Sequence, residues 1–292
     1  MKIQHWYDQT TGTWTYLVAD LEAAKAVVID PVWDYDPVSG IPDTGSVAQV
    51  LSYAEEHGLG IEYVLETHAH ADHLSAAGYL RDRTGARIGI GEGIRQVQAV
   101  FNQILNLESD KPCGEGFDRL LRDGDRLVLG SLEIKVMHTP GHTPDSVTYL
   151  VGDVAFIGDT LFMPDFGTAR CDFPGGDAGV LYDSIQKIFQ LPEETRLLMC
   201  HDYPPAGSPQ PRMMCTVAEA RKNNIHIKDG TSREDFSAMR KSRDSQLNLP
   251  KLIYPSLQVN VLGGCSPEPE NNGVTYLKIP FNRTVASILQ DN

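Results

Sequence analysis

Residues 67–73 read Thr-His-Ala-His-Ala-Asp-His and concentrate the side-chain types that bind metal ions. His68, His70 and His73 lie there beside Asp72, although the whole chain has only 9 histidines. Neutral imidazoles and carboxylates are donors to zinc and iron. Three histidines in six residues is an improbable spacing for an ordinary solvated loop, so the run predicts part of a metal site.

Three more residues of ligand type each follow a strand-like apolar run. His142 lies in Thr-Pro-Gly-His-Thr-Pro-Asp, Asp159 ends Phe-Ile-Gly-Asp, and His201 follows Leu-Leu-Met-Cys. Each residue alone is more typical of a turn or a core. A layered α/β sheet brings strand ends to one edge, however, and ligand sites form there. We therefore expect all seven residues to share one metal site.

The order His-x-His-x-Asp-His, Gly-His-Thr, Gly-Asp and a late His resembles the metallo-β-lactamase fold superfamily over residues 10–205. This resemblance implies the α/β class, an αββα sandwich of the metallo-β-lactamase type with the metal at the sheet edges. It predicts a catalytic domain over residues 1–205, and a C-terminal helical extension and tail over residues 206–292 packed on the same domain.

Three finer motifs resemble the persulfide dioxygenase branch, the sulfur dioxygenases related to the ethylmalonic encephalopathy protein. They are Arg-Cys-Asp-Phe at 170–173, His-Asp-Tyr at 201–203 and Leu-Asn-Leu-Pro-Lys at 247–251. This resemblance implies an oxidoreductase that uses O₂ to convert a thiol persulfide, glutathione persulfide or a similar one, to sulfite and free thiol. Sulfide detoxification would be its context.

The dioxygenase resemblance implies one Fe(II) per chain, held by His68, His142 and Asp159. Two imidazoles and one carboxylate form the facial triad of non-haem iron oxygenases, which leaves positions for the persulfide sulfur and O₂. The remaining ligand-type residues would then orient the ligands and bound water. They are His70, Asp72, His73 and His201.

The same seven residues are also the ligand set of a binuclear site with two Zn ions or a Zn/Fe pair. In that alternative, His68, His70 and His142 would bind one ion. Asp72, His73 and His201 would bind the other, and Asp159 would bridge the two. A hydroxide between them would hydrolyse a thioester, as in the glyoxalase II type. The motifs leave both occupancies open, and the 247–251 segment favours the dioxygenase. A metal-binding sensor without turnover is disfavoured because all seven residues are intact.

The resemblance also implies contacts with the substrate. Arg170 would pair with a carboxylate of glutathione, and the Tyr203 hydroxyl would bind the reacting sulfur; Asp72 and Tyr203 are the predicted catalytic groups. A structural pairing of Arg170 with Asp172 is the alternative. Residues 223–226 read Asn-Asn-Ile-His, where an Asn-Pro-Arg run is expected, which leaves a thiol carrier other than glutathione open.

Cysteine count and charge limit the class of protein. The chain has 5 cysteines, an odd number without a Cys-x-x-Cys pair, which disfavours a disulfide framework. We expect Cys171 to be a small buried filler beside the site. Lys+Arg 25 against Asp+Glu 39 gives 25 − 39 = −14, which disfavours nucleic-acid and membrane partners. Because the sequence shows no signal peptide and no long apolar span, we predict a cytoplasmic protein. Its expected partners are small molecules, and the sequence is compatible with a homo-oligomer.

The apolar periodicity predicts the elements that position these residues. A hairpin is expected over 14–30, and a long surface loop over the Pro- and Gly-rich residues 31–45. The remaining expected elements are helices at 46–57, 75–85, 93–108 and 181–189, strands at 61–66, within 125–159 and at 195–200, two polar helices at 217–224 and 233–243, and a Pro-punctuated tail.

Overall fold

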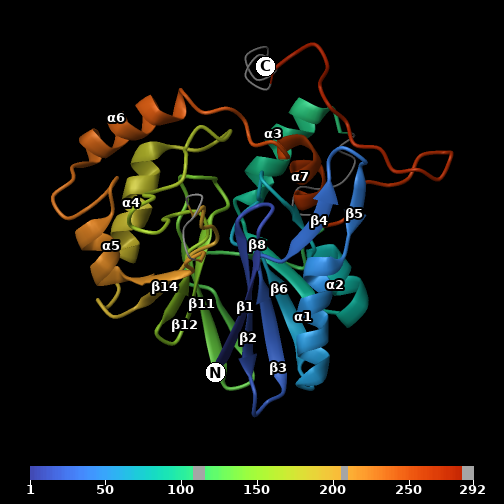
Figure 1. Cartoon of the computed structure of the whole chain (residues 1–292), viewed down its shortest axis with the longest axis horizontal. Coiled ribbons are helices and arrows are strands. Elements are labelled where there is room, and N and C mark those ends of the chain that lie inside the picture. The colour runs from blue at the N-terminus through green and yellow to red at the C-terminus, as the bar shows by residue number, and fades with distance from the viewer. Residues whose placement is uncertain (108–115, 205–209, 285–292) are drawn as a thin grey trace.

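The computed structural model describes residues 1–107, 116–204 and 210–284. Two facing sheets form its centre, and helices cover both outer faces (Figure 1). Within the described residues, the first sheet has the order β1-β2-β3-β6-β8-β9 and the second the order β10-β11-β12-β13-β14-β15. The αββα sandwich implied by the sequence is confirmed.

The first sheet consists of β1 (Lys2–Asp8), β2 (Thr13–Asp20), β3 (Lys25–Ile29), β6 (Gly60–Leu65), β8 (Arg87–Gly91) and β9 (Arg119–Leu121). The second consists of β10 (Arg126–Leu129), β11 (Leu132–His138), β12 (Val147–Val151), β13 (Val154–Phe156), β14 (Arg196–Leu198) and β15 (Met214–Thr216). A small third sheet contains β4 (Val32–Asp36), β5 (Ile41–Asp43) and β7 (Leu74–Ser75). The helices are α1 (Gly45–Glu56), α2 (Ala77–Thr84), α3 (Ile94–Leu105), α4 (Ala178–Ile188), α5 (Val217–Asn223), α6 (Arg233–Asp244) and α7 (Ile253–Asn260).

The apolar core has separate layers that match the sandwich. Side chains of both sheets, such as Tyr16, Tyr149 and Phe156, pack between the sheets. A second layer joins the first sheet to α1 and α2, and a third joins the second sheet to α4, α5 and α6. Every residue of β2 is buried, because one face of the strand packs against the second sheet and the other against the helix layer.

Most elements expected from periodicity are confirmed, and two expectations are wrong. The surface loop expected over residues 31–45 contains the hairpin β4–β5, because Pro37 and Gly40 lie in its turn while Val32 and Trp33 pair with β7. The tail after residue 244 contains α7, whose helical pattern Pro255 obscures. The helix expected to reach residue 108 ends at Leu105, because Asn106 takes the left-handed conformation. Cys113 and the domain boundary expected at 205 lie outside the described residues.

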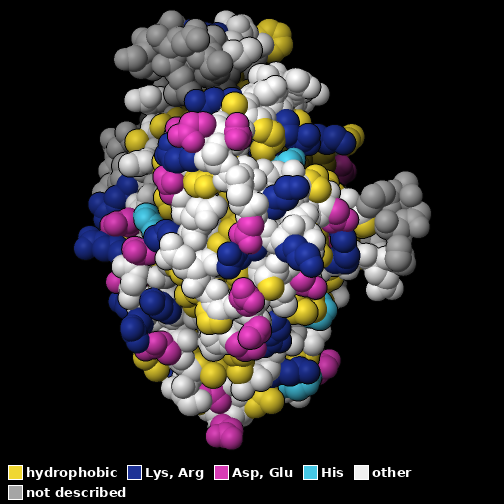
Figure 2. All heavy atoms as spheres, turned by 90° about the vertical axis from the view of Figure 1, so that its left-hand side faces the viewer, with side chains coloured by type: hydrophobic (Ala, Val, Ile, Leu, Met, Phe, Trp, Pro, Cys, Tyr) yellow, Lys and Arg dark blue, Asp and Glu magenta, His cyan; other side chains and the backbone are white. Residues whose placement is uncertain are grey.

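The outer surface mixes both signs of charge. On the face that carries α4, α5 and α6, basic and acidic side chains alternate (Figure 2), and several are paired, such as Arg233 with Asp183 and Arg221 with Asp229. Among the described residues, no helix combines the length and the apolar character that crossing a membrane requires. The absence of a nucleic-acid partner remains a prediction.

Candidate metal centre

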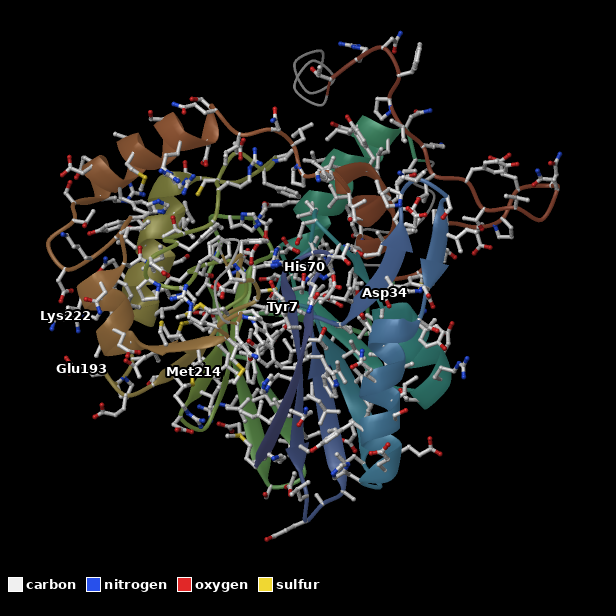
Figure 3. The ribbon with its side chains drawn as sticks, in the orientation of Figure 1. Tyr7, Asp34, His70, Glu193, Met214 and Lys222 are labelled. Atoms are coloured by element: carbon white, nitrogen blue, oxygen red, sulfur yellow. The ribbon has the colours of Figure 1, made fainter. Side chains whose placement is uncertain are left out.

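All seven ligand-type residues follow strands that end at the same edge of the sandwich. Figure 3 places His70 near the middle of the molecule, where the ends of both sheets meet. Residues 67–73 follow β6 but are not part of a strand. The alternation of side chains along a strand therefore does not determine where their side chains point. The rings of His68 and His70 nevertheless lie side by side, with centroids 4.1 Å apart.

His68, His142 and Asp159 form one candidate ligand set. The Nε2 atoms of His68 and His142 each lie 3.8 Å from Asp159 Oδ2. His142 Nδ1 donates a hydrogen bond of 2.7 Å to the Arg170 carbonyl, and His68 Nδ1 lies 3.1 Å from Thr67 Oγ1. Both imidazoles thus have Nδ1 engaged by the protein, which leaves the Nε2 lone pairs directed at the carboxylate.

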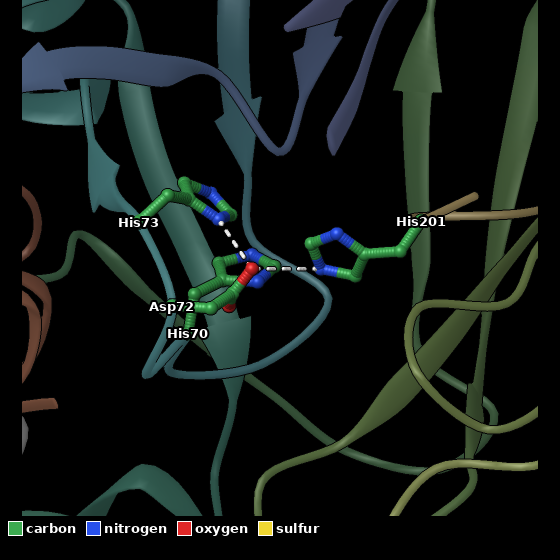
Figure 4. A group of neighbouring side chains, drawn as sticks. All are labelled: His70, Asp72, His73 and His201. Carbon is green, nitrogen blue, oxygen red and sulfur yellow. Dashed lines mark ion pairs between the residues drawn. The ribbon is translucent and has the colours of Figure 1, made fainter. Parts of the chain in front are cut away.

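A second candidate set consists of His70, Asp72, His73 and His201. Asp72 Oδ2 lies 3.5 Å from His73 Nδ1 and 3.4 Å from His201 Nε2, the two ion pairs drawn in Figure 4. His201 Nε2 also lies 3.5 Å from Asp159 Oδ1, so the two sets are contiguous. The structure thus brings the seven residues together, and their binding of a metal stays a prediction.

The residues present fit a metal ion. Among the described residues, His68 Nε2, His201 Nε2 and Asp159 Oδ1 are buried without a hydrogen-bond partner, and an unpaired buried polar group costs about 1–3 kcal/mol. Zinc and iron ligands lie about 2.1 Å from the ion, so two ligands at right angles are about 3.0 Å apart. The separations of 3.8 Å need to close by less than about 1 Å.

The protonation states suit metal binding at His68. Burial and the neighbouring imidazoles lower the pKa of His68 well below its usual value, so its ring is neutral. Burial also lowers the pKa of His73. Burial opposes ionisation of Asp72, but His201 and His73 outweigh it and hold the pKa of this carboxyl well below its usual range.

Asp30 supports the site, and the sequence analysis did not single it out. It follows β3 with a positive φ of 49°, and its carboxylate accepts hydrogen bonds from the Thr67 backbone and hydroxyl and lies 3.1 Å from His70 Nε2. Burial disfavours the charge on His70, but Asp30 and Glu66 raise its pKa well above the usual value. The sequence signal that could have identified Asp30 is its place at the end of the apolar run Ala-Val-Val-Ile-Asp.

Asp145 joins the two ligand-bearing loops. It is fully buried, three residues after His142, and its Oδ2 accepts a hydrogen bond of 2.7 Å from the backbone N–H of Ala69, between His68 and His70. Burial raises the pKa of Asp145. The connection fixes a loop of the second sheet against a loop of the first.

The expected substrate residues occupy different surroundings. The Arg170 guanidinium makes two hydrogen bonds to Asp172, of 2.6 and 2.7 Å, and a third to the Asn248 carbonyl. Its backbone carbonyl, rather than its side chain, reaches the metal ligands through His142. The Tyr203 ring stacks on His201 at 5.6 Å. Cys171 is buried, and burial raises the pKa of its thiol.

The sequence of this chain is similar to those of known proteins. The family model described as "Metallo-beta-lactamase superfamily" matches residues 9–201. A probable metallo-hydrolase of Burkholderia pseudomallei (strain 1710b) is 49% identical, with 97% of this chain and 99% of that protein covered. The mitochondrial persulfide dioxygenase ETHE1 of Homo sapiens is 31% identical, with 85% and 82% covered.

One solved structure and one longer protein are also similar to this chain. The crystal structure of ETHE1 from Myxococcus xanthus has a TM-score of 0.73 and 33% identity, and covers 91% of this chain and all of that one. The chain also spans 65% of the length of a beta-lactamase hydrolase-like protein of Xylella fastidiosa (strain Temecula1), to which it is 48% identical over 96% of its own length.

Proposed function

The chain belongs to the metallo-β-lactamase superfamily, and from this premise we propose that it is a non-haem Fe(II) persulfide dioxygenase. The proposed reaction is RSSH + O₂ + H₂O → RSH + SO₃²⁻ + 2 H⁺, in which the outer sulfur is oxidised and O₂ is reduced. Its relatives include a protein named as a persulfide dioxygenase, and a more similar one named as a probable metallo-hydrolase.

One observation carries the proposal: the seven residues divide into two unequal sets. His68, His142 and Asp159 direct two imidazole Nε2 atoms and a carboxylate oxygen toward one point, as in a facial triad. In the other set, His70 Nε2 is already engaged by the carboxylates of Asp30 and Glu66, at 3.1 and 3.2 Å. This asymmetry favours one ion with supporting groups over two equivalent ions.

Fe(II) held by the triad would offer adjacent open positions for a persulfide sulfur and O₂. It would also supply electrons to O₂, which redox-inert zinc cannot do. His142 and Asp159 are the more exposed members, at 9% and 8%, and His68 is 1% exposed. These exposures favour an approach of substrate on the side of His142 and Asp159. His68 forms the closed floor of the site.

The surrounding residues hold the ligands and limit water. The rings of Phe162 and Tyr203 lie 6.4 and 5.6 Å from that of His201, and Phe173 lies 6.3 Å from His142, so apolar surface borders the ligand set. Asp72 stays ionised, and we assign it the orientation of His73 and His201 rather than the acceptance of a proton. Tyr203 remains our proposed contact for the sulfur.

A specific observation also supports a second candidate, the binuclear thioester hydrolase. His70, Asp72, His73 and His201 have one ligand atom each within 4.8 Å of one another, and Asp159 contacts both sets. His70 thus groups with Asp72, His73 and His201, whereas the binuclear alternative from the sequence expected it with His68 and His142. The arrangement accommodates a second ion with Asp159 bridging. The two candidates differ in metal count and in their need for O₂.

The test measures metal content and oxygen use on the same preparation. Protein purified anaerobically should contain one Fe per chain, consume O₂ with glutathione persulfide and release sulfite in equal amount. His142→Ala should lose the metal and the activity. His57→Ala, at the exposed end of α1, should keep both. Two metals per chain with thioester hydrolysis in the absence of O₂ would replace the dioxygenase by the hydrolase.

A further inference from the structure

Asn260, the last residue of α7, uses its whole carboxamide on the loop that carries the clustered histidines. Its Nδ2 donates hydrogen bonds of 2.8 Å to the carbonyls of His70 and His73, and its Oδ1 accepts one of 2.8 Å from the Ser75 N–H. The side chain is 4% exposed. Two donors and one acceptor are therefore satisfied by one segment of backbone.

The two carbonyls that Asn260 binds belong to backbone outside helix and strand, and the Ser75 N–H belongs to β7. Residues 66–73 connect β6 to β7 without regular structure, so the backbone there is not aligned by a sheet ladder. The two carbonyls that Asn260 binds precede and follow Asp72 in the chain. Asn260 thus fixes the backbone on both sides of Asp72. The loop therefore has little freedom to turn its side chains away from the metal centre.

Contacts outside this loop also set the position of Asn260. Leu257 and Val261 of the same region pack with Ile90, Ile94 and Phe101 in one apolar cluster. Figure 1 shows α7 beside α3, far from the N-terminal end of the chain. Gln258 further fixes the helix end, because its amide binds the carbonyls of Tyr254 and Lys278 and the Lys278 N–H.

We propose that Asn260 is a positioning residue for the loop that carries His68 of the proposed triad together with the supporting residues His70, Asp72 and His73. Only a carboxamide offers two N–H donors and a carbonyl acceptor in one plane; an aspartate would oppose the two carbonyls with a second acceptor. The residue lies beyond position 201, where the match to the family model ends. The C-terminal region is thus part of the metal centre and not only a cover for the sandwich.

The inference rests on the metal centre of the proposed function but not on its reaction, so the test reads metal retention. Asn260→Asp in the full chain is compared with Gln258→Glu, a matched amide-to-acid change on the same helix. Gln258 is equally buried, at 1% exposed, and contacts Tyr254 and Lys278 rather than the ligand loop. Urea unfolding of both metal-free variants measures any general loss of stability.

Fe(II) affinity is measured anaerobically by competition with a chelator. Because groups that orient metal ligands typically change affinity by about 10–100-fold, we expect that loss for Asn260→Asp, with kcat reduced and KM for the persulfide little changed. Gln258→Glu should bind Fe(II) as the wild type does. Asn260→Ser, which removes the donors without adding charge, should give a similar loss and replaces the acid variant where that one does not fold.

Two results separate this inference from the proposed function. If both Asn260 variants bind Fe(II) as tightly as wild type, Asn260 has no positioning role, whatever the reaction is. If wild type binds the metal but consumes no O₂, the dioxygenase proposal fails while a selective loss of affinity at Asn260 still supports this inference. Equal losses in Asn260→Asp and Gln258→Glu would assign the effect to α7 packing and overturn the proposal.

Discussion

Replacing Asp145 tests whether the two ligand loops are joined as the structure indicates. The carboxylate is fully buried and accepts the 2.7 Å hydrogen bond from the Ala69 N–H. Asp145→Ala leaves that N–H without a partner. A hydrogen bond to a charged group contributes about 1.5–3 kcal/mol, and an unpaired buried donor costs about 1–3 kcal/mol. These figures describe the same loss, so we expect about 2–3 kcal/mol of destabilisation.

The assay is urea unfolding of protein freed of metal by a chelator, so that metal binding does not mask the change. Asp118→Ala is the matched control, because the Asp118 carboxylate accepts a similar 2.8 Å bond from the Ile88 N–H but is exposed. Water replaces an exposed acceptor, and we expect a loss below about 1 kcal/mol there. A loss at Asp145 no larger than that at Asp118 would refute the reasoning.

The pH dependence of Asp145→Asn gives a second, independent readout. Burial raises the pKa of Asp145 in the folded protein, so the folded state binds more protons than the unfolded one above the ordinary carboxyl pKa of about 4. Wild-type stability from this group is present at lower pH and is lost as pH rises through the folded pKa. The asparagine does not titrate. The stability of Asp145→Asn relative to wild type should therefore increase from about pH 4 toward neutrality, and a decrease would contradict the assigned cause.

Three further changes test other parts of the structure. Asp20→Asn removes a carboxylate bound by the N–H groups of Ser131 and Ala23, which lower its pKa to about 2; the variant should be less stable at pH 7, and the difference in unfolding midpoint should vanish as pH falls from about 4 to about 2. Asp244→Ala leaves the buried Arg240 unpaired and should cost about 3–5 kcal/mol in urea unfolding, whereas a cost below about 1 kcal/mol would place the pair in contact with water. Arg170→Ala should raise KM for the persulfide more than it lowers kcat if the guanidinium anchors substrate, and an unchanged KM would leave it the structural role of binding Asp172 and the Asn248 carbonyl.

The cluster of candidate metal ligands could be predicted from sequence because the signal of each member is local. His68, His142 and His201 each follow a short apolar run, and apolar runs of this length indicate buried strands. Their common location then follows from the layered α/β architecture. The prediction needed only residue type, spacing and the strands before them.

The supporting residues could not be found in the same way. Asn260 is one amide in a proline-interrupted segment, and neither periodicity nor a motif relates it to residues 70–75. The hairpin of β4 and β5 was missed because Pro37 and Gly40 indicate a turn but not the strands on either side. Long-range polar contacts leave no periodic trace in a sequence, since they depend on a single side chain reaching a distant backbone.

The dependence of the ligand loop on α7 has a consequence for biosynthesis. A ribosome that has just added His201 must still add 260 − 201 = 59 residues before Asn260 exists. At about 5–20 residues per second this takes about 3–12 s. During that interval every histidine and aspartate of the cluster is already part of the nascent chain, but the loop between β6 and β7 lacks its carboxamide brace. The metal centre should therefore mature only after Asn260 has been added, so metal insertion is a late event in the synthesis of the polypeptide.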